Sequence, residues 1–220
     1  MLLAALTGFR AGTASSVEVV DALRDARLLV PLVAHAGDEG VTDAGLRVDK
    51  TQELSLVTVE GPDGRTVLPA FTSVEALTAW NPGARPIPVA ARRAALAAAA
   101  ESTELIVLDP GSATEFVLRR PMVWALAQDV AWQPPHENAD VLDAFELSIA
   151  SEPAVAGIRL VAGDPDSRQR GQELLVVLAI VPGLDQAALG ALVARLQASW
   201  SAHPVITERV DSLGVRLTMA

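Results

Sequence analysis

Residues 64–80 read Gly-Arg-Thr-Val-Leu-Pro-Ala-Phe-Thr-Ser-Val-Glu-Ala-Leu-Thr-Ala-Trp, and this stretch says most about the fold. Thr66 to Phe71 is apolar and partly β-branched, which predicts a strand. Thr72 and Glu75 have the spacing of a capping box, in which a hydroxyl and a carboxylate satisfy the first free N–H groups of a helix. We therefore expect a strand that turns directly into a short helix ending near Trp80.

The strand signal extends upstream of this stretch. Gly61-Pro-Asp-Gly64 supplies the dihedral angles of a tight turn, so Leu54 to Val59 is predicted as the other strand of a hairpin. Leu28 to Ala34 is a further buried strand. Because proline has no N–H for a ladder, Pro31 predicts an edge position or a bulge, and Pro69 marks a second edge strand.

The other elements before residue 130 follow from capping and turn signals. Ser15 and Glu18 form a second capping-box pattern for a helix to about Ala26. After it we expect an alanine-rich helix over Val89–Ser102. A hairpin of Glu104–Asp109 and Glu115–Arg119, closed by a Pro-Gly turn, and a helix over Pro121–Gln128 follow it.

The region around Pro134-Pro135 is the best candidate for a linker. We expect an N-terminal domain over residues 1–130, a linker over 131–138 and a C-terminal domain over 139–220. The last of these shows the order α-β-β-α-β, with helices at Ala139–Ala150 and Asp185–Ser201, a turn at Gly163–Asp166, and strands at Ala156–Ala162, Glu173–Val181 and Gly214–Met219. The predicted fold class is α+β (α/β), with two small mixed, mainly antiparallel sheets each covered by helices.

Composition excludes several function classes. The chain has 220 residues, 50% of them hydrophobic, and a net charge of −10. An acidic chain is a poor partner for a nucleic-acid backbone or an anionic membrane surface, and we expect neither. With no cysteine, the chain has no disulfide, thiolate metal site or cysteine nucleophile. No convincing targeting segment and no apolar run of membrane-spanning length are present, so a cytoplasmic location is expected.

Catalytic signatures are absent as well. The sequence holds no glycine-rich phosphate loop, no nucleophile elbow and no zinc-protease motif. Acids gather in the predicted loop Ala36 to Thr51, next to His35, but their spacing matches no calcium loop, and a solvated loop is favoured over a metal site. Asp164 and Asp166 are read as turn residues rather than ligands. We predict no catalytic, cofactor-binding or metal-binding residue.

Tryptophans are the costliest side chains to place. Trp80, Trp124 and Trp200 lie on predicted helices, where packing is the favoured explanation. Trp132 lies in the predicted linker. It either holds one domain against the other or faces a partner.

Four stretches together resemble one protein family: Ala26-Arg-Leu-Leu-Val-Pro-Leu-Val33, Ser55-Leu-Val-Thr-Val59, Gly64 to Ser73 with Glu75-Ala-Leu77 and Trp80, and Leu105-Ile-Val-Leu-Asp-Pro110. They resemble the N-terminal domain of the SseB family, bacterial proteins named for enhanced serine sensitivity. Residues 138–220 are similar in pattern to the family's C-terminal domain. The resemblance implies an α/β domain of uncertain biochemical role with no established catalytic residues.

These observations leave two main functional hypotheses. The first is a non-enzymatic cytoplasmic module that binds another protein or forms a homodimer. Its candidate interaction corner consists of Leu68, Pro69, Phe71, Thr72 and Ser73. Exposed backbone donors at this corner would bind a peptide strand or a small anion. The same corner is also explained by packing and capping alone.

The second hypothesis is a small-ligand sensor or an enzyme linked to amino-acid (serine) metabolism, as the family name hints. A pocket that holds Asp109, Glu115 or the acids of the 36–51 loop would favour it. A third class, part of a secretion or envelope assembly, would need a large exposed apolar face.

Overall fold

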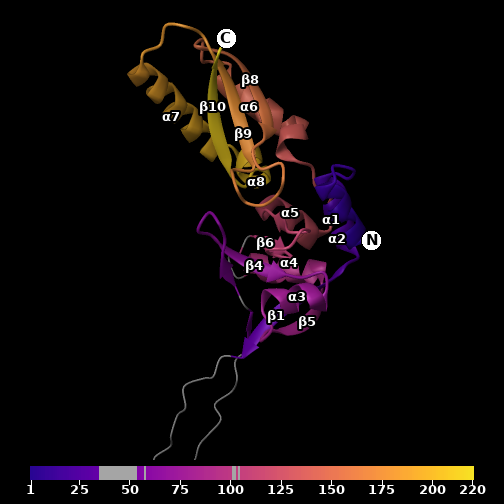
Figure 1. Ribbon diagram of the computed structural model, residues 1–220. Helices are drawn as coiled ribbons and strands as arrows, with labels where there is room; N and C mark the ends of the chain where they lie inside the picture. The colour runs from indigo at the N-terminus through magenta and orange to yellow at the C-terminus, as the bar shows by residue number, and fades with distance from the viewer. Residues whose placement is uncertain (35–53, 57, 101–102, 104) are drawn as a thin grey trace, which may run out of the picture.

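The computed structural model describes residues 1–34, 54–56, 58–100, 103 and 105–220. These residues form eight α-helices, one short 3-10 helix and three small sheets, which confirms the predicted α+β class. Figure 1 shows an elongated molecule, with the earlier residues at one end and the later residues at the other. We call residues 1–134 the N-terminal part and residues 135–220 the C-terminal part.

The strands of the N-terminal part form two sheets rather than the one expected. One has the order β2-β1-β5 and the other β3-β4-β6-β7. A pair of backbone hydrogen bonds between Leu29 and Phe71, both 2.8 Å, joins the two sheets. The strands are β1 Arg27–Ala34, β2 Leu54–Leu56, β3 Val59–Glu60, β4 Thr66–Ala70, β5 Arg85–Ala90, β6 Ile106–Leu108 and β7 Phe116–Leu118.

Pro31 and Pro69 lie inside paired strands, so the expectation that they mark edge strands is wrong. β1 lies between β2 and β5, and β4 lies between β3 and β6. The N–H of Leu29 points to β4 and that of Leu68 points to β6. Since backbone groups alternate along a strand, the nitrogens of both prolines face the seam between β1 and β4, where the pairing with β2 and β3 has ended. Among the described residues, no ladder bond is lost there.

Two further pairings differ from the predicted ones. Arg85–Ala90 forms the edge strand β5, and helix α4 begins only at Ala91, although the sequence predicts its start at Val89. Pro86 and Pro88 favour extended backbone, and β5 pairs with β1 over six residues. The segment predicted as the hairpin partner of β4 forms two strands in different sheets. β2 pairs with β1, and only β3 pairs with β4. The hairpin of β6 and β7 is as predicted.

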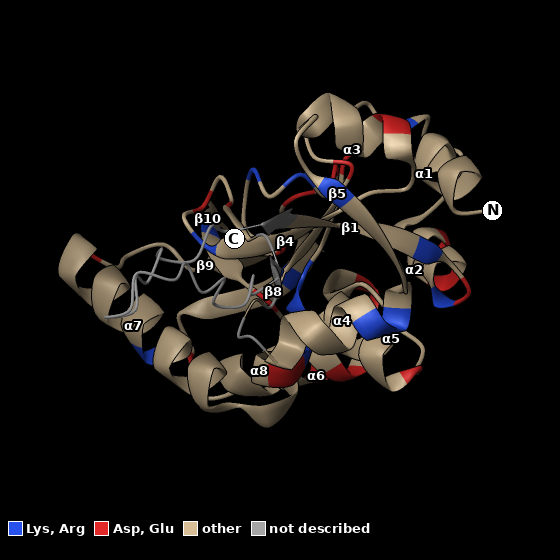
Figure 2. Ribbon diagram, turned by 90° about the horizontal axis from the view of Figure 1, so that it is seen from below, with Lys and Arg blue, Asp and Glu red and all other residues tan. Residues whose placement is uncertain are grey.

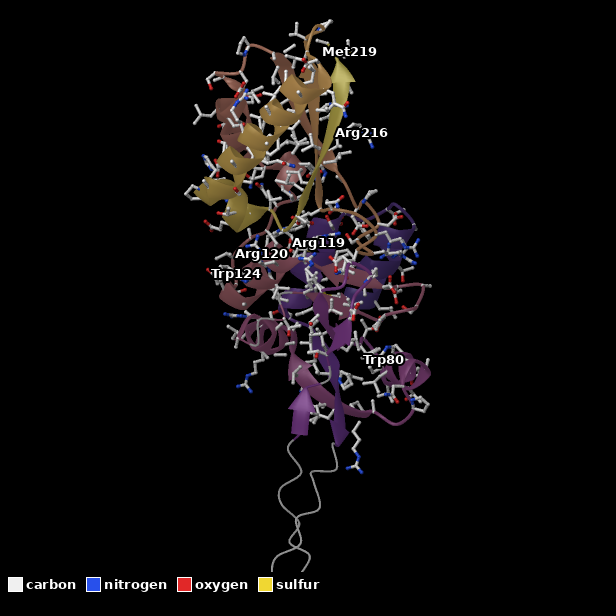
Figure 3. All side chains as sticks on the ribbon, turned by 90° about the vertical axis from the view of Figure 1, so that its left-hand side faces the viewer. Trp80, Arg119, Arg120, Trp124, Arg216 and Met219 are labelled. Atoms are coloured by element: carbon white, nitrogen blue, oxygen red, sulfur yellow. The ribbon has the colours of Figure 1, made fainter. Side chains whose placement is uncertain are left out.

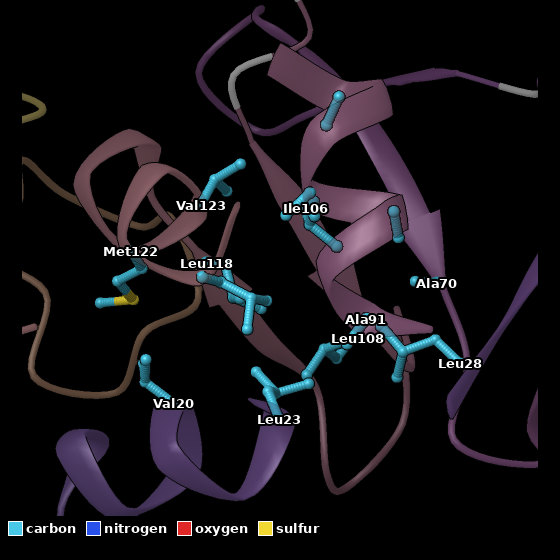
Figure 4. Packing of buried hydrophobic residues seen from close by; sticks show 14 of the residues in the cluster. Val20, Leu23, Leu28, Ala70, Ala91, Ile106, Leu108, Leu118, Met122 and Val123 are labelled. Carbon is cyan, nitrogen blue, oxygen red and sulfur yellow. The ribbon is translucent and has the colours of Figure 1, made fainter. Parts of the chain in front are cut away.

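Helices from both ends of the N-terminal part cover the sheets. Figure 4 shows side chains of α2 and α5 meeting strand residues such as Ile106, Leu108 and Leu118, all fully buried. The alanine-rich face of α4 packs on the same cluster because small side chains allow a close approach. The helices are α1 Leu2–Arg10, α2 Ser16–Arg24, α3 Val74–Trp80, α4 Ala91–Ala100 and α5 Arg120–Gln128.

The two predicted capping boxes have different outcomes. Ser15 accepts a hydrogen bond from the Glu18 N–H, and the Glu18 carboxylate accepts one from the Ser15 N–H, so this box is confirmed. The second box is wrong by one residue, because Ser73 caps α3 by accepting from the Ala76 N–H. Thr72 does not cap the helix, since its hydroxyl is bonded elsewhere.

The C-terminal part is a three-stranded sheet of order β10-β9-β8 with helices packed against it. β8 and β9 are antiparallel, whereas β9 and β10 are parallel. A parallel pair needs a long crossover, and α7 followed by the unexpected helix α8 provides it. The elements are the 3-10 helix Pro135–Glu137, α6 Ala139–Ile149, β8 Val155–Ala162, β9 Leu174–Ile180, α7 Gln186–Ala202, α8 Pro204–Arg209 and β10 Leu213–Met219.

The hydrophobic core of the C-terminal part is separate from that of the N-terminal part. At its centre Trp200 packs edge-to-face on Phe145 with ring centroids 5.1 Å apart, and the indole N–H donates to Ser148 Oγ at 2.7 Å. Separate cores are what two domains would have. We keep the domain boundary at residues 131–138 as a proposal.

Figure 2 shows acidic and basic residues interspersed over the helices of both parts. Local ion pairs follow from this mixture, such as those of Asp129, at the end of α5, with Arg24 and Arg92. Within the described ranges, no helix is long and apolar enough to span a membrane.

Candidate functional site

The two parts of the chain meet around one buried arginine. Arg119 directly follows β7 and is the N-cap residue of α5, so a sheet strand and a helix both fix its backbone. Figure 3 shows Arg119 at the middle of the molecule, between the two ends. Its side chain is 3% exposed. A guanidinium this deeply buried needs carboxylates and further acceptors close by.

The C-terminal part supplies all the acceptors that the structure gives Arg119. Nη2 donates to Asp164 Oδ2 and to the Gly171 carbonyl, both at 2.6 Å. Nη1 donates to Asp211 Oδ2 and to Ser212 Oγ, both at 3.2 Å. A single side chain of the N-terminal part therefore joins two segments of the C-terminal part, one before β9 and one before β10.

A second arginine strengthens the same junction. Arg65 donates two parallel hydrogen bonds to the Asp211 carboxylate, both 2.9 Å, and a third to Asp63 at 2.7 Å. Burial disfavours the charged form of Asp211, but the hydrogen bonds and charges of Arg65 and Arg119 outweigh it and lower the pKa of this carboxyl. Asp211 is thus held as a carboxylate between the two guanidinium groups.

Residues 163–171, which we call the junction turn, make further contacts with the N-terminal part. The Ser167 carbonyl accepts from the Val117 N–H at 2.8 Å, and Gln169 Nε2 donates to Asp63 at 2.5 Å. Ser167 and Gln169 both have positive φ, which is unfavourable for residues with a Cβ. Asp164 stabilises this backbone, because it accepts the Gln169 N–H at 2.8 Å in addition to Arg119.

Close approach also restricts the start of the junction turn. A Cβ on Gly163 would collide with the carbonyl oxygen of Gln172. Only glycine fits there.

Glu173, directly before β9, is the least satisfied ionisable group of the junction. Its side chain is buried, with 7% of the residue exposed. Oε2 accepts the Asp211 N–H at 2.6 Å, but Oε1 accepts no hydrogen bond from the described residues. Burial, and then the nearby charge of Asp211, raise the pKa of Glu173 to about 7 despite that hydrogen bond and the charges of Arg119 and Arg120.

Glu173 also contributes to the lining of a cavity of about 240 Å³ between the two parts, which we call the junction pocket. Its walls come from the start of α2, from α5, from the segment around Trp132 and from the junction turn. The pocket is lined by Ser15, Ser16, Val17, Arg119, Met122, Trp132, Pro134, Pro135, His136, Glu137, Ala162, Asp164, Pro165, Ser167 and Glu173.

Trp132 is the aromatic wall of the junction pocket. It is 7% exposed and packs into the hydrophobic cluster of the N-terminal part, while its indole N–H has no acceptor among the described residues. This burial disagrees with the predicted role of facing a partner, and the other predicted role, holding one domain against the other, stays a prediction. Glu173 Oε1 and the Trp132 indole N–H thus have no partner among the described residues, and both atoms are shielded from solvent.

Metal binding finds no support in this arrangement. Among the residues that the structure describes, no group of three or more His, Asp or Glu side chains could hold a metal ion. The acids of the Ala36 to Thr51 loop lie outside the described residues.

The corner predicted from sequence, Leu68 to Ser73, is not part of the junction pocket, and the hydroxyl groups of Thr72 and Ser73 are already bonded. Leu68 and Phe71 are fully buried. Thr72 donates its N–H and its hydroxyl to Asp109 at 2.8 and 2.7 Å. The chain's own carboxylate thus takes the place that an external anion would occupy.

Of the other residues that the sequence brought forward, Trp132 and Asp164 line the junction pocket, whereas Asp109 and Glu115 do not. Asp109 bonds Thr72 and Thr114, and Glu115 accepts the Gly111 N–H. Trp200 is buried as predicted, but Trp124 is 41% exposed on α5, so the packing expected for it is wrong.

Sequence reasoning missed the residues that build this site. Arg119 follows an apolar strand, Glu173 precedes one, and Asp211 comes two residues before another. Charged residues at strand ends are usually solvated, so their type alone does not set them apart. Only the packing of the two parts makes these three ends coincide.

The raised pKa of Glu173 predicts a pH dependence of stability. Between about pH 4.5 and 7 the folded chain holds a proton that the unfolded chain has released, so the free energy of unfolding falls as pH rises through this window. The full loss is about 3 kcal/mol. In Glu173→Gln this loss is absent, so the variant gains stability relative to the wild type between pH 5 and pH 8.

Urea unfolding at several pH values measures this difference. Glu137→Gln is the matched control, because Glu137 lines the same pocket but its side chain is 66% exposed. Parallel stability curves for Glu173→Gln and the wild type would contradict a raised pKa at Glu173.

Comparison with known proteins identifies the family. The family model of the SseB protein N-terminal domain matches residues 2–125. No curated protein and no solved structure gave a significant match. Residues 126–220 lie beyond the family match, so their resemblance to the family's C-terminal domain stays a prediction. Because the match covers more than half of the chain and carries the strands and helices that present Arg119, the chain belongs to the SseB family.

Proposed function

We propose that this SseB-family protein binds a small molecule in the junction pocket and acts as a ligand sensor. The observation that carries this proposal is the cavity of about 240 Å³ between the two parts, whose lining combines apolar side chains with Asp164 and the buried Glu173, a group of raised pKa. Titratable groups shifted by burial in a pocket cluster at functional sites. This favours the ligand hypothesis from the sequence over binding at the Leu68 to Ser73 corner.

The pocket walls suggest how binding would be sensed. Val17 and Met122 belong to the N-terminal part, whereas Asp164 and Glu173 belong to the C-terminal part. A molecule that contacts both walls binds best when the parts are held as they are here. Binding then stabilises this arrangement over any other, which is the thermodynamic requirement for a sensor.

A thermal-shift screen of small metabolites tests the proposal. We expect at least one compound that raises the melting temperature of the wild type and not that of Ala162→Phe, which fills the pocket. Ala156→Phe is the matched control, because it is the same substitution on an exposed position of the same strand. A screen in which no compound distinguishes Ala162→Phe from the control would contradict ligand binding at this site.

A specific observation also supports the interaction role expected from the sequence. β10 is an edge strand of seven residues without proline, and Arg216 is its only charged residue. Leu174 N–H donates to the Ser212 carbonyl, so the backbone groups of Leu213, Val215, Leu217 and Met219 point away from β9. Such an unprotected edge can pair with another strand.

We propose that a second copy of the chain pairs with β10. Antiparallel pairing about a two-fold axis at Val215 would set Arg216 opposite Gly214 of the second copy, so the two arginines avoid each other. Leu217 and Met219, 39% and 72% exposed, adjoin a hollow that Val181 and Leu184 also line. Figure 3 shows Met219 at the end of the molecule far from Arg119.

Light scattering after size exclusion tests the dimer. We expect a dimer for the wild type at tens of micromolar and a monomer for Leu217→Arg, because the substitution buries an unpaired charge against the apolar Leu213 of the second copy. Leu147→Arg on α6 is the matched control, since Leu147 is also exposed and apolar but lies away from β10, and it stays dimeric. A wild type that is monomeric throughout this range would contradict the proposal.

A further inference from the structure

A second cavity lies between α5 and α8, and we call it the α5–α8 pocket. Its volume is about 420 Å³, and its lining comes from α5, from residues 130–133, from Asn138 and from the end of α8. Arg120, at the start of α5, donates to the carbonyls of Thr207 and Val210 at 2.9 and 2.6 Å. These hydrogen bonds fix α8 against α5, so the pocket has walls on two anchored helices.

Trp124 gives the α5–α8 pocket an exposed aromatic wall. It is 41% exposed, whereas a tryptophan on a helix is expected to pack inside the protein. Figure 3 shows it at the surface, at the level where the two parts meet. Gln128 follows one turn later on the same face of α5 and is exposed as well. Neither side chain has a hydrogen-bond partner among the described residues, so both are accessible to a ligand.

Other polar side chains of the α5–α8 pocket are held in place by hydrogen bonds. Arg209 Nη1 donates to Asn138 Oδ1 at 3.2 Å and to Asp140 Oδ2 at 2.8 Å. Asn138 Nδ2 in turn donates to Gln133 Oε1 at 3.3 Å. This chain of bonds orients Gln133, whose Nε2 donates to no acceptor in the described part of the chain. A donor fixed in this way loses little conformational entropy when it binds a ligand.

The charges of the α5–α8 pocket balance. Glu208 and Arg209 are the charged residues of its lining as described, and the other polar members are amides, which both donate and accept hydrogen bonds. Glu208 is exposed and has no partner among the described residues, so its carboxylate is a free acceptor. Such a lining favours a neutral ligand with several groups that donate and accept, and hydroxyl groups do both.

We propose that the α5–α8 pocket binds a neutral sugar, with one face of the sugar ring on Trp124 and its hydroxyl groups bonded to Gln128, Gln133 and Glu208. The C–H groups of a sugar ring face the negative π surface of an indole, and the hydroxyl groups project from the ring edge. A purely aromatic ligand would cover Trp124 but leave the amides without partners. The inference does not rest on ligand binding in the junction pocket.

Saturation-transfer NMR of the full-length protein with four neutral probes tests the proposal: the methyl glycosides of glucose, galactose, mannose and N-acetylglucosamine. We expect at least one of them to bind the wild type. Trp124→Ala is expected to weaken that binding by about tenfold or more, because the stacking surface is lost. Leu96→Ala is the matched control, since Leu96 is also exposed and apolar but lies on α4 outside the pocket, and it is expected to change binding by less than about twofold.

Tryptophan fluorescence gives an independent readout. Trp124 is the most exposed of the four tryptophans, so a sugar ring packed on it is expected to shift the emission of the wild type. Trp124→Phe keeps an aromatic surface, and we expect it to bind the sugar but to show no such shift. A loss of binding that came from misfolding would not leave the Phe variant active in binding.

Two further probes test the ligand class. Cyclohexanol has a ring of similar size with a single hydroxyl group, and glucuronate adds a carboxylate to the sugar. Both are expected to bind about tenfold more weakly than the best neutral sugar, because the first leaves the amides unpaired and the second brings its charge toward Glu208. Equal binding of either probe would overturn the assignment to a neutral sugar.

The outcomes separate this inference from the proposed function. Sugar binding is expected to be unchanged in Ala162→Phe, because Ala162 lines the junction pocket and not the α5–α8 pocket. A sugar that still binds Trp124→Ala but is lost in Ala162→Phe would overturn this inference and support ligand binding in the junction pocket. Failure of all four neutral probes to bind the wild type would overturn the inference and leave the proposed function in place.

Discussion

The arrangement of the two parts depends on one buried charge. Arg119 ends a strand and begins a helix of the N-terminal part, and its guanidinium is bonded to Asp164 and Asp211 of the C-terminal part. Removing one partner of such a pair leaves an uncompensated charge away from water, which costs about 3–5 kcal/mol. The acceptors of Arg119 lie in the junction turn and directly before β10. Its hydrogen bonds therefore position these two segments and, with the junction turn, part of the wall of the junction pocket.

The same arrangement buries the carboxyl group of Glu173, and this burial is the feature most relevant to function. Arg65 and Arg119 are hydrogen-bonded to Asp63, Asp164 and Asp211, and the charges of Arg119 and Arg120 only partly offset the burial of Glu173. Its carboxyl is buried by the same contacts and keeps one oxygen without a donor among the described residues. A carboxyl in this state stays protonated to a higher pH than a solvated acid, because burial disfavours its charged form.

Local signals predicted the elements well and the pairing of distant segments less well. The Ser15 capping box, the hairpin of β6 and β7 and the helix from Gln186 to Ala202 all follow from patterns within a few residues. The prediction that Pro31 and Pro69 mark edge strands failed because a strand with neighbours on both sides can contain a position whose backbone nitrogen donates no ladder hydrogen bond. The site was beyond sequence reasoning, because Arg119 and Glu173 meet only through the packing of the two parts.

A double-mutant cycle on Arg119 and Asp164 measures the central interaction most directly. The free energies of unfolding of the wild type, Arg119→Met, Asp164→Asn and the double variant would be determined in urea at neutral pH. The buried ion pair predicts a coupling free energy of about 2 kcal/mol, with Arg119→Met alone destabilising by about 3–5 kcal/mol. Effects that add to within about 0.5 kcal/mol would contradict the claim that this pair holds the two parts together.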